Sequence, residues 1–243
     1  MAPIKAILFD MFDTLMLIEK NHAFHNPSLH ATHKFLAENG IPVKFEDFEK
    51  AYVTARDSLY SEATPELEEP HFNIRIAKAL KQLGYDYDAS SPLVMGATNT
   101  FCERFMTYVK IDQHTKKVLH QLRQHYEMGI VSNFAIPECV YKLLEKHGLE
   151  KYFDAIIVSG AINRRKPHLD IYKRAVQELG VTADETVFVG DTVDADVLGP
   201  QAAGMRTIYL ERRPQKDVEN ARPTQTIQSL DQLVAAIEKC SAP

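Results

Sequence analysis

The chain has 243 residues, of which 45% are hydrophobic and 25% are charged, as in an ordinary globular protein. Its net charge of −5 and pI near 6.1 predict no nucleic-acid or membrane-surface partner, and no apolar run approaches the roughly 20 residues of a membrane helix. Its three widely spaced cysteines form neither a disulfide framework nor a metal knuckle, and its start does not resemble a secretory signal, so we expect a reducing, cytoplasmic location.

The first predicted element is a strand over residues 4–9. This apolar, β-branched run ends abruptly at Asp10, and such a run is typical of a strand covered on both faces, as in a parallel sheet. A carboxylate at the carboxyl end of such a strand lies where open α/β sheets bind their ligands. A strand followed by an ordinary turn that contains Asp explains this stretch equally well. Residues further along the chain are needed to distinguish a ligand-binding Asp10 from a turn residue.

Residues 17–110 show helical periodicity and no convincing strand. Helices are predicted to begin at Asn26-Pro27 and at Ser91-Pro92, and to stop at Gly40 and Gly84. Two further stripes at helical spacing are predicted to be buried: Phe45, Phe48, Tyr52, Ala55 and Leu59, and then Ile74, Ala77, Leu80 and Leu83. Four helices that follow a single strand predict an inserted helical subdomain.

From Thr115 onward, helices and strands alternate. Strands are predicted over residues 127–131, 155–158, 186–189 and 207–210, with helices over 137–147, 169–179 and 194–203 between them. This alternation predicts right-handed crossovers onto one parallel sheet, and therefore an α/β fold. Residues 212–226 are predicted to be a loop, and Ser229 with Gln232 predicts a capping box for a final amphipathic helix.

Polar residues follow three of the predicted strands. Asp10 ends the first, Ser132 ends the second, and Asp191 ends the strand over 186–189, with Asp194 and Asp196 shortly after it. Because the carboxyl ends of parallel strands meet at one rim, these side chains should converge. Lys166, in the loop after the strand over 155–158, could reach the same rim.

These residue types suit phosphoryl chemistry. Clustered carboxylates tolerate one another when a hard cation such as Mg²⁺ lies between them. The hydroxyls of Thr14 and Ser132 and the ammonium of Lys166 are donors for a phosphoryl group. A carboxylate beside a cation and a lysine, such as Asp10, can attack phosphorus and form an aspartyl phosphate.

The order of these motifs resembles the haloacid dehalogenase-like (HAD) hydrolase superfamily over nearly the whole chain. The motifs that carry the resemblance are Phe9-Asp10-x-x-Asp13-Thr14-Leu15, Val131-Ser132-Asn133, Lys166-Pro167, and Gly190-Asp191-Thr192-Val193-Asp194-Ala195-Asp196 followed by Gly199-Pro200 and Ala203-Gly204-Met205. The resemblance implies a Rossmann-like core over residues 1–16 and 111–243, a helical C1 cap over 17–110, and a phosphorylated small-molecule substrate. The pattern also resembles a poorly understood subgroup of the family, and this closer resemblance does not identify a particular substrate.

The resemblance also implies the roles of the site residues. Asp10 would be the nucleophile, assisted by Thr14, Ser132 and Lys166, while Phe12 and Asn133 would contact the substrate. Mg²⁺ would be held by Asp10, by the backbone carbonyl of Phe12, by Asp191 and by Asp196 or Asp194, of which the family spacing favours Asp196.

One position departs from the family's phosphatases. The residue two after the nucleophile is usually a second Asp that acts as general acid and base, and here it is Phe12. Asp13 is one place later, where a one-residue shift turns its side chain away, so we expect it to stabilise the turn. Three hypotheses remain: a phosphatase for leaving groups that need no proton, a metal-independent 2-haloacid dehalogenase, or a catalytically reduced binding module. The acidic pair Asp191 and Asp196 favours the phosphatase, because the family's dehalogenases usually lack it. Residues 19–22 also contain no counterpart of the dehalogenases' halide-binding Arg.

The remaining polar residues of the helical segment are weaker candidates. The histidines do not have the spacing of a zinc site, and a polar face explains them better: His22, His25, His30 and His33. Arg56 could meet an anionic substrate, although such an arginine is more often a surface residue. The oligomeric state is open between monomer and homodimer.

Overall fold

The computed structural model describes residues 2–19, 23–63, 66–213 and 221–241. Its centre is a six-stranded parallel sheet in the order β5-β4-β1-β6-β7-β8. The strands are β1 (Ala6–Phe9), β4 (Glu127–Ser132), β5 (Ala155–Val158), β6 (Thr186–Gly190), β7 (Arg206–Leu210) and β8 (Gln225–Ile227). The predicted α/β fold, a Rossmann-like parallel sheet, is confirmed.

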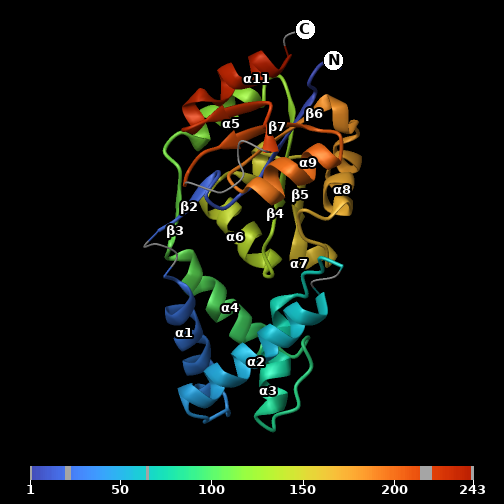
Figure 1. Ribbon diagram of the computed structural model, residues 1–243. Coiled ribbons are helices and arrows are strands. Elements are labelled where there is room, and N and C mark those ends of the chain that lie inside the picture. Colours follow the sequence, from blue (N-terminus) through green and yellow to red (C-terminus); the bar gives the residue numbers. More distant parts are fainter. Residues whose placement is uncertain (1, 20–22, 64–65, 214–220, 242–243) are drawn as a thin grey trace.

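Helices cover both faces of this sheet (Figure 1). They are α5 (Thr115–Leu122), α6 (Pro137–His147), α7 (Ser159–Ile162), α8 (Leu169–Leu179), the π-helical turn η4 (Val193–Leu198), α9 (Gly199–Ala202) and α11 (Leu233–Ser241), with short 3₁₀ turns η2 (Glu150–Tyr152), η3 (Ala183–Glu185) and η5 (Leu230–Gln232). Ile7 and Phe9 pack into the core on the side of α5, α6 and α11, whereas Leu8 packs with Ile171 and Tyr172 of α8. Side chains of β1 therefore alternate between two buried faces, which explains why this strand contains no polar residue.

Four helices form an insertion that lies to one side of the sheet (Figure 1). They are α1 (His25–Glu38), α2 (Phe45–Ala63), α3 (Phe72–Gln82) and α4 (Pro92–Met106). The chain enters and leaves this insertion through an antiparallel ribbon of β2 (Met16–Ile18) and β3 (Val109–Ile111). The prediction of no strand within residues 17–110 is therefore wrong at both ends, because strands of three residues are too short to show an alternating pattern.

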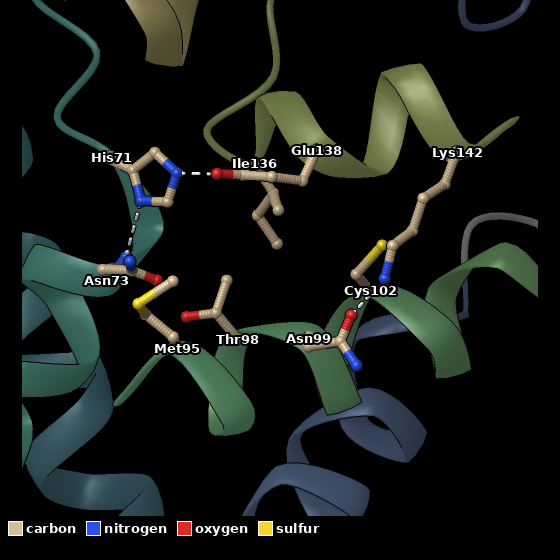
Figure 2. A pocket seen from close by; sticks show the side chains of 9 residues that line it. All are labelled: His71, Asn73, Met95, Thr98, Asn99, Cys102, Ile136, Glu138 and Lys142. Carbon is tan, nitrogen blue, oxygen red and sulfur yellow. Dashed lines mark hydrogen bonds and ion pairs between the residues drawn. The ribbon is translucent and has the colours of Figure 1, made fainter. Parts of the chain in front are cut away.

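A seam joins the helical insertion to α6 of the sheet region (Figure 2). The backbone N–H of Phe72 donates to Ala135 O at 2.9 Å, and His71 Nε2 lies 3.1 Å from Glu138 Oε2. A cavity of ≈ 160 Å³ lies at this seam, between residues of α3, α4 and α6. None of the polar residues predicted at the strand ends lines it, so it is separate from the rim of the sheet.

Several predicted boundaries match the structure and others do not. Proline at the first turn and glycine after the last explain why the bounds of α6 were predicted correctly, with Gly148 left-handed at φ 62°. Helix α1 begins at His25 rather than after Asn26, which leaves Pro27 in the first turn. Ser229 makes no capping hydrogen bond, and β8 occupies the end of the predicted loop 212–226.

The stripe predicted for α3 is only partly correct, because Leu80 is buried and Ala77 and Leu83 pack partly buried against the core. Ile74 is 41% exposed, whereas the buried face carries Phe72, Arg75, Ile76, Ala79 and Leu80. A charged residue on the buried face is invisible to a pattern that searches for apolar residues. The stripe predicted for α2 holds better, because Phe48, Tyr52, Ala55 and Leu59 are buried. None of the helices among the described residues is long and apolar enough to cross a lipid bilayer.

Candidate active site

Asp10 lies at the carboxyl end of the central strand β1. Its backbone N–H donates to Val189 O at 2.9 Å, which continues the pairing of β1 with β6 by one residue. The carboxylate is buried, and its two oxygens have different partners: Oδ1 lies 2.7 Å from Lys166 Nζ, and Oδ2 accepts from Thr14 Oγ1 at 3.2 Å. The side chain is therefore fixed in orientation before any ligand binds.

Lys166 joins two of the predicted acidic residues. Its Nζ lies 2.7 Å from Asp10 Oδ1 and 2.7 Å from Asp196 Oδ1, and the side chain is almost fully buried. The amide of Asn133 holds the backbone of Lys166, since Lys166 N donates to Asn133 Oδ1 at 2.8 Å and Asn133 Nδ2 donates to Lys166 O at 3.0 Å. Asn133, predicted to contact substrate, therefore at least positions the lysine.

Three carboxylates meet at the same rim. One oxygen each from Asp10, Asp191 and Asp196 lie within 4.8 Å of one another, and all three residues are buried. Asp196 reaches this position from the turn η4, where its Oδ2 accepts from Thr192 N at 2.9 Å. Asp194, the sequence's other candidate, is exposed. A Cβ on Gly190 would lie 2.4 Å from Asp196 Cγ, so only glycine leaves room for this carboxylate.

The electrostatics of the cluster favour an added cation. Burial raises the pKa of Asp10 to about 7, with Lys166 acting against it and Asp196 and Asp191 adding to it. Burial also raises the pKa of Asp191 to about 6, together with the charges of Asp196 and Asp13. Burial opposes the charge of Lys166, but Asp10 and Asp196 outweigh it and raise the lysine's pKa. Carboxylate oxygens are the ligands that Mg²⁺ prefers, so the donor set fits this ion.

Ser132 and Phe12 complete the predicted set. Ser132 ends β4 and is fully buried, and its Oγ has no hydrogen-bond partner among the described residues, which suits a group reserved for a ligand. Phe12 packs against Phe105 and Phe134 with ring centroids 5.4 Å and 4.9 Å away. Asp13, at φ 59°, accepts from Ile18 N at 3.1 Å, as expected of an acid that stabilises the turn.

A cavity of ≈ 330 Å³ opens over these groups. Asp10, Phe12, Lys166, Asp191 and Asp196 all line it. The convergence predicted from the strand ends is therefore present for Asp10 and Asp191, which face one space with Lys166 and Asp196, whereas Ser132 does not line this cavity.

A comparison with known proteins decides the family. A family model described as a haloacid dehalogenase-like hydrolase matches residues 4–204. The chain belongs to this family. It is also 26% identical over 240 residues to the glyceraldehyde 3-phosphate phosphatase of Methanocaldococcus jannaschii, with 97% of each chain covered. This protein is therefore a hydrolase of the HAD superfamily.

Two solved structures share its fold. The 2-haloacid dehalogenase from Pseudomonas syringae pv. Tomato DC3000 has a TM-score of 0.76 at 24% identity, covering 98% of this chain and 99% of that one. The HAD-hydrolase YfnB from Bacillus subtilis, solved bound to magnesium, has a TM-score of 0.60 at 23% identity, covering 97% and 99%. At these identities the likeness shows the fold alone, and the chemistry has to be argued from this hydrolase's own residues.

The sequence did not predict two arginines of the site of this HAD hydrolase, because they lie in the predicted loop after β7. Arg212 donates to Asp13 O and Thr14 O, both at 3.1 Å, and to Asp112 Oδ2 at 2.8 Å, so it ties the turn after Asp10 to the rest of the rim. Arg213 lies 2.5 Å from Asp13 Oδ2 and 3.5 Å from Asp191 Oδ2. Their position just after a strand of the same parallel sheet was a signal that could have found them.

The weaker candidates do not join this site. Arg56 pairs with its neighbour Asp57 at 2.8 Å on α2. His30 stacks on Phe45 and His33 lies 2.8 Å from Val43 O, while His22 is outside the described residues. No second cluster of metal-ligating side chains is found in the described part of the chain.

Proposed function

We propose that this HAD hydrolase is a Mg²⁺-dependent small-molecule phosphatase that works through an aspartyl phosphate on Asp10. The observation that carries the proposal is the buried carboxylate of Asp10 placed 2.7 Å from Lys166 Nζ and within 4.8 Å of carboxylate oxygens of Asp191 and Asp196. The relative named as a phosphatase over 97% of both chains supports the same reaction class.

Each residue has a distinct part in this proposal. Asp10 attacks phosphorus, the bond from phosphorus to the leaving oxygen breaks, and the leaving group departs with the electron pair; water then hydrolyses the aspartyl phosphate. Lys166 and the hydroxyls of Thr14 and Ser132 stabilise charge on the phosphoryl oxygens. Asp10, Asp191, Asp196 and the backbone carbonyl of Phe12 would hold Mg²⁺, which supplies positive charge to the transferred group.

Phe12 restricts the substrate. Its ring offers no proton, and the acid beside it, Asp13, is engaged by Ile18 N and Arg213. A leaving group that must be protonated therefore receives no help from this position, whereas an acyl phosphate or an acidic aryl phosphate needs none. We infer that activated phosphates are hydrolysed faster than simple alkyl monoesters.

The same residue favours a second candidate, a 2-haloacid dehalogenase. There Asp10 would attack carbon, and a halide would leave without a proton and without Mg²⁺. The buried cluster of Asp10, Asp191 and Asp196 argues against a dehalogenase. Without a metal these three carboxylates repel one another, and the positive charges that offset the repulsion are those of Lys166 and Arg213.

The proposal is tested by phosphate release from acetyl phosphate and p-nitrophenyl phosphate with Mg²⁺ or with EDTA. We expect turnover that needs Mg²⁺, disappears in Asp10→Asn and falls strongly in Asp196→Asn. Asp194→Asn makes the same chemical change two residues away on the exposed side and should keep the activity. Turnover that survives Asp10→Asn in a folded protein would exclude this nucleophile.

The predicted organisation of the chain is part of the proposal. We infer that residues 17–110 act as a cap over a core formed by 1–16 and 111–243, since the helical insertion reaches the rim through the ribbon β2–β3. The three cysteines of the whole protein are buried and form no disulfide with one another, which fits a reducing, cytoplasmic setting. Its partner is a phosphorylated small molecule, bound by a monomer or homodimer.

A further inference from the structure

A second cavity adjoins the catalytic one, between the helical insertion and residues 133–136 of the sheet region. Its volume is ≈ 200 Å³, and it shares Phe24, Asn133 and Phe134 with the cavity over Asp10. Its remaining lining includes four aromatic side chains of α2, α3 and α4, namely Tyr52, Tyr60, Phe72 and Phe101. A leaving group attached to a phosphoryl group at Asp10 would extend towards this space, and its apolar, ring-lined wall suits a planar body.

One charged side chain on the wall has no acidic partner. Arg75 of α3 is 9% exposed and lines this cavity. Its guanidinium donates to Tyr52 Oη at 3.0 Å and to Tyr60 Oη at 3.2 Å, and its Nε–H has no hydrogen-bond partner. Among the described residues no carboxylate forms an ion pair with it. A buried guanidinium is normally paired with a carboxylate, whereas this one is held by phenol hydroxyls and has no carboxylate within ion-pair distance among the described residues.

The aromatic surroundings hold the guanidinium in place. Its carbon lies 5.1 Å from the ring centres of Phe72 and Tyr60 and 5.7 Å from that of Tyr52. These rings fix the plane of the Arg75 guanidinium. A planar guanidinium in a fixed orientation matches the geometry of a carboxylate well.

The one acid on the same wall does not cancel this charge. Glu69 lies at 6% exposure and accepts from Tyr60 Oη at 3.4 Å rather than from Arg75. Burial raises the pKa of Glu69, and the charge that opposes this most is that of Arg165, ahead of Arg75. Glu69 is thus held towards its neutral form, and the charge of Arg165 acts on it more strongly than that of Arg75.

We propose that this cavity receives the leaving group of the substrate and that Arg75, with the hydroxyl of Tyr52, binds a carboxylate on it. The substrate class is a phosphate whose acidic leaving group has a planar apolar body and a carboxylate at its far end. This inference rests on the proposed phosphatase function. It also accounts for the absence of an acid at Phe12, since an aryl or acyl oxygen leaves without a proton.

The test compares 4-carboxyphenyl phosphate with 4-carbamoylphenyl phosphate, which differ in charge but hardly in shape. We expect the wild type to prefer the carboxylate by roughly tenfold or more in kcat/KM, mainly through KM, as for a charge-assisted hydrogen bond. In Arg75→Met this preference should fall to about twofold or less. The difference in leaving-group reactivity between the two substrates cancels when kcat/KM of the wild type is divided by kcat/KM of the variant for each substrate. Arg75→Lys should keep part of it.

Lys78→Met is the matched control. Lys78 lies one turn further along α3, pairs with Glu62 at 3.0 Å and does not line the cavity, so its loss removes the same charge and should leave the preference unchanged. A wild type without preference for the carboxylate would overturn the inference, and this measurement requires no variant to fold. A preference that persists in a folded Arg75→Met protein would overturn it as well.

A binding measurement separates this inference from the proposed function. Calorimetry with 4-hydroxybenzoate and 4-hydroxybenzamide probes the cavity without any turnover. If no phosphate ester is hydrolysed but the acid alone binds, and binds only while Arg75 is present, the phosphatase proposal fails and the carboxylate site stands. If esters are hydrolysed while acid and amide bind equally, the site fails and the phosphatase stands.

Discussion

Replacing Lys166 with methionine tests the charge balance of the rim. Lys166 is 3% exposed, and its Nζ is 2.7 Å from both Asp10 Oδ1 and Asp196 Oδ1. Methionine keeps most of the apolar stem but removes the cation, so that Asp10, Asp191 and Asp196 lose the charge that separates them. Removing one partner of a buried ion pair typically costs about 3–5 kcal/mol, and we expect a loss of this size above pH 8 without Mg²⁺.

The loss should depend on pH in a defined window. The pKa of Asp10 is about 7 in the folded protein, above its ordinary 3.8, so the folded state holds a proton that the unfolded state releases, and stability falls as pH rises from about 4 to about 7. Without Lys166, the pKa of Asp10 lies higher still. The contribution of Asp10 to the penalty of the substitution therefore grows by about 1.4 kcal/mol per pH unit above 7, or up to about 2 kcal/mol by pH 8.5.

The assay is urea unfolding followed by circular dichroism at about pH 6 and about pH 8.5, in EDTA and in Mg²⁺. Lys173→Met, an exposed lysine on α8 whose side chain is 69% exposed, should change stability by no more than about 0.5 kcal/mol at either pH. Mg²⁺ should recover part of the loss in Lys166→Met, because it replaces the missing positive charge. An equal loss at both pH values would show that Lys166 contributes packing and not charge compensation.

Three further predictions concern the same rim. Phe12→Asp should raise the hydrolysis of poor leaving groups by about 10²–10⁴-fold, as measured with an alkyl monoester, and no gain in a folded protein would mean that the missing acid does not limit the reaction. Asn133→Ala removes both hydrogen bonds to the Lys166 backbone, so kcat should fall and the urea midpoint should report a loss of about 1–3 kcal/mol; an unchanged kcat would show that the lysine is held without it. Mg²⁺ should raise the thermal midpoint more at about pH 8 than at about pH 5.5, because it must displace protons from Asp10 and Asp191, whose pKa values are about 7 and 6; an equal rise at both pH values would exclude these ligands.

The sequence was sufficient for features that follow from chain geometry. Parallel strands place their carboxyl ends at one rim, so Asp10, Ser132 and Asp191 could be expected near one another before any coordinates were known. Proline and glycine mark helix ends through local backbone preferences, which explains the correct bounds of α6 and α8. These features depend on a few neighbouring residues or on the order of elements alone.

Other features depend on contacts between segments that are distant in sequence. Arg75 is buried because Tyr52 and Tyr60 of another helix accept its hydrogen bonds, and no property of α3 alone predicts this. Arg212 acts on Asp13 and Thr14 about 200 residues earlier, and its own surroundings resemble an ordinary loop. The choice of Asp196 over Asp194 required the course of η4, a π-helical turn where an ordinary helix was predicted.

The covalent intermediate is the most direct test of the account. We would mix the protein with Mg²⁺ and acetyl phosphate, quench in acid within the first turnover and locate the phosphoryl group by mass spectrometry of its peptides. The account predicts a phosphoryl group on Asp10 that is absent in EDTA and in Asp10→Asn. No phosphoryl group on Asp10 during active turnover, or an ester of Asp10 formed from a 2-haloacid without metal, would contradict it.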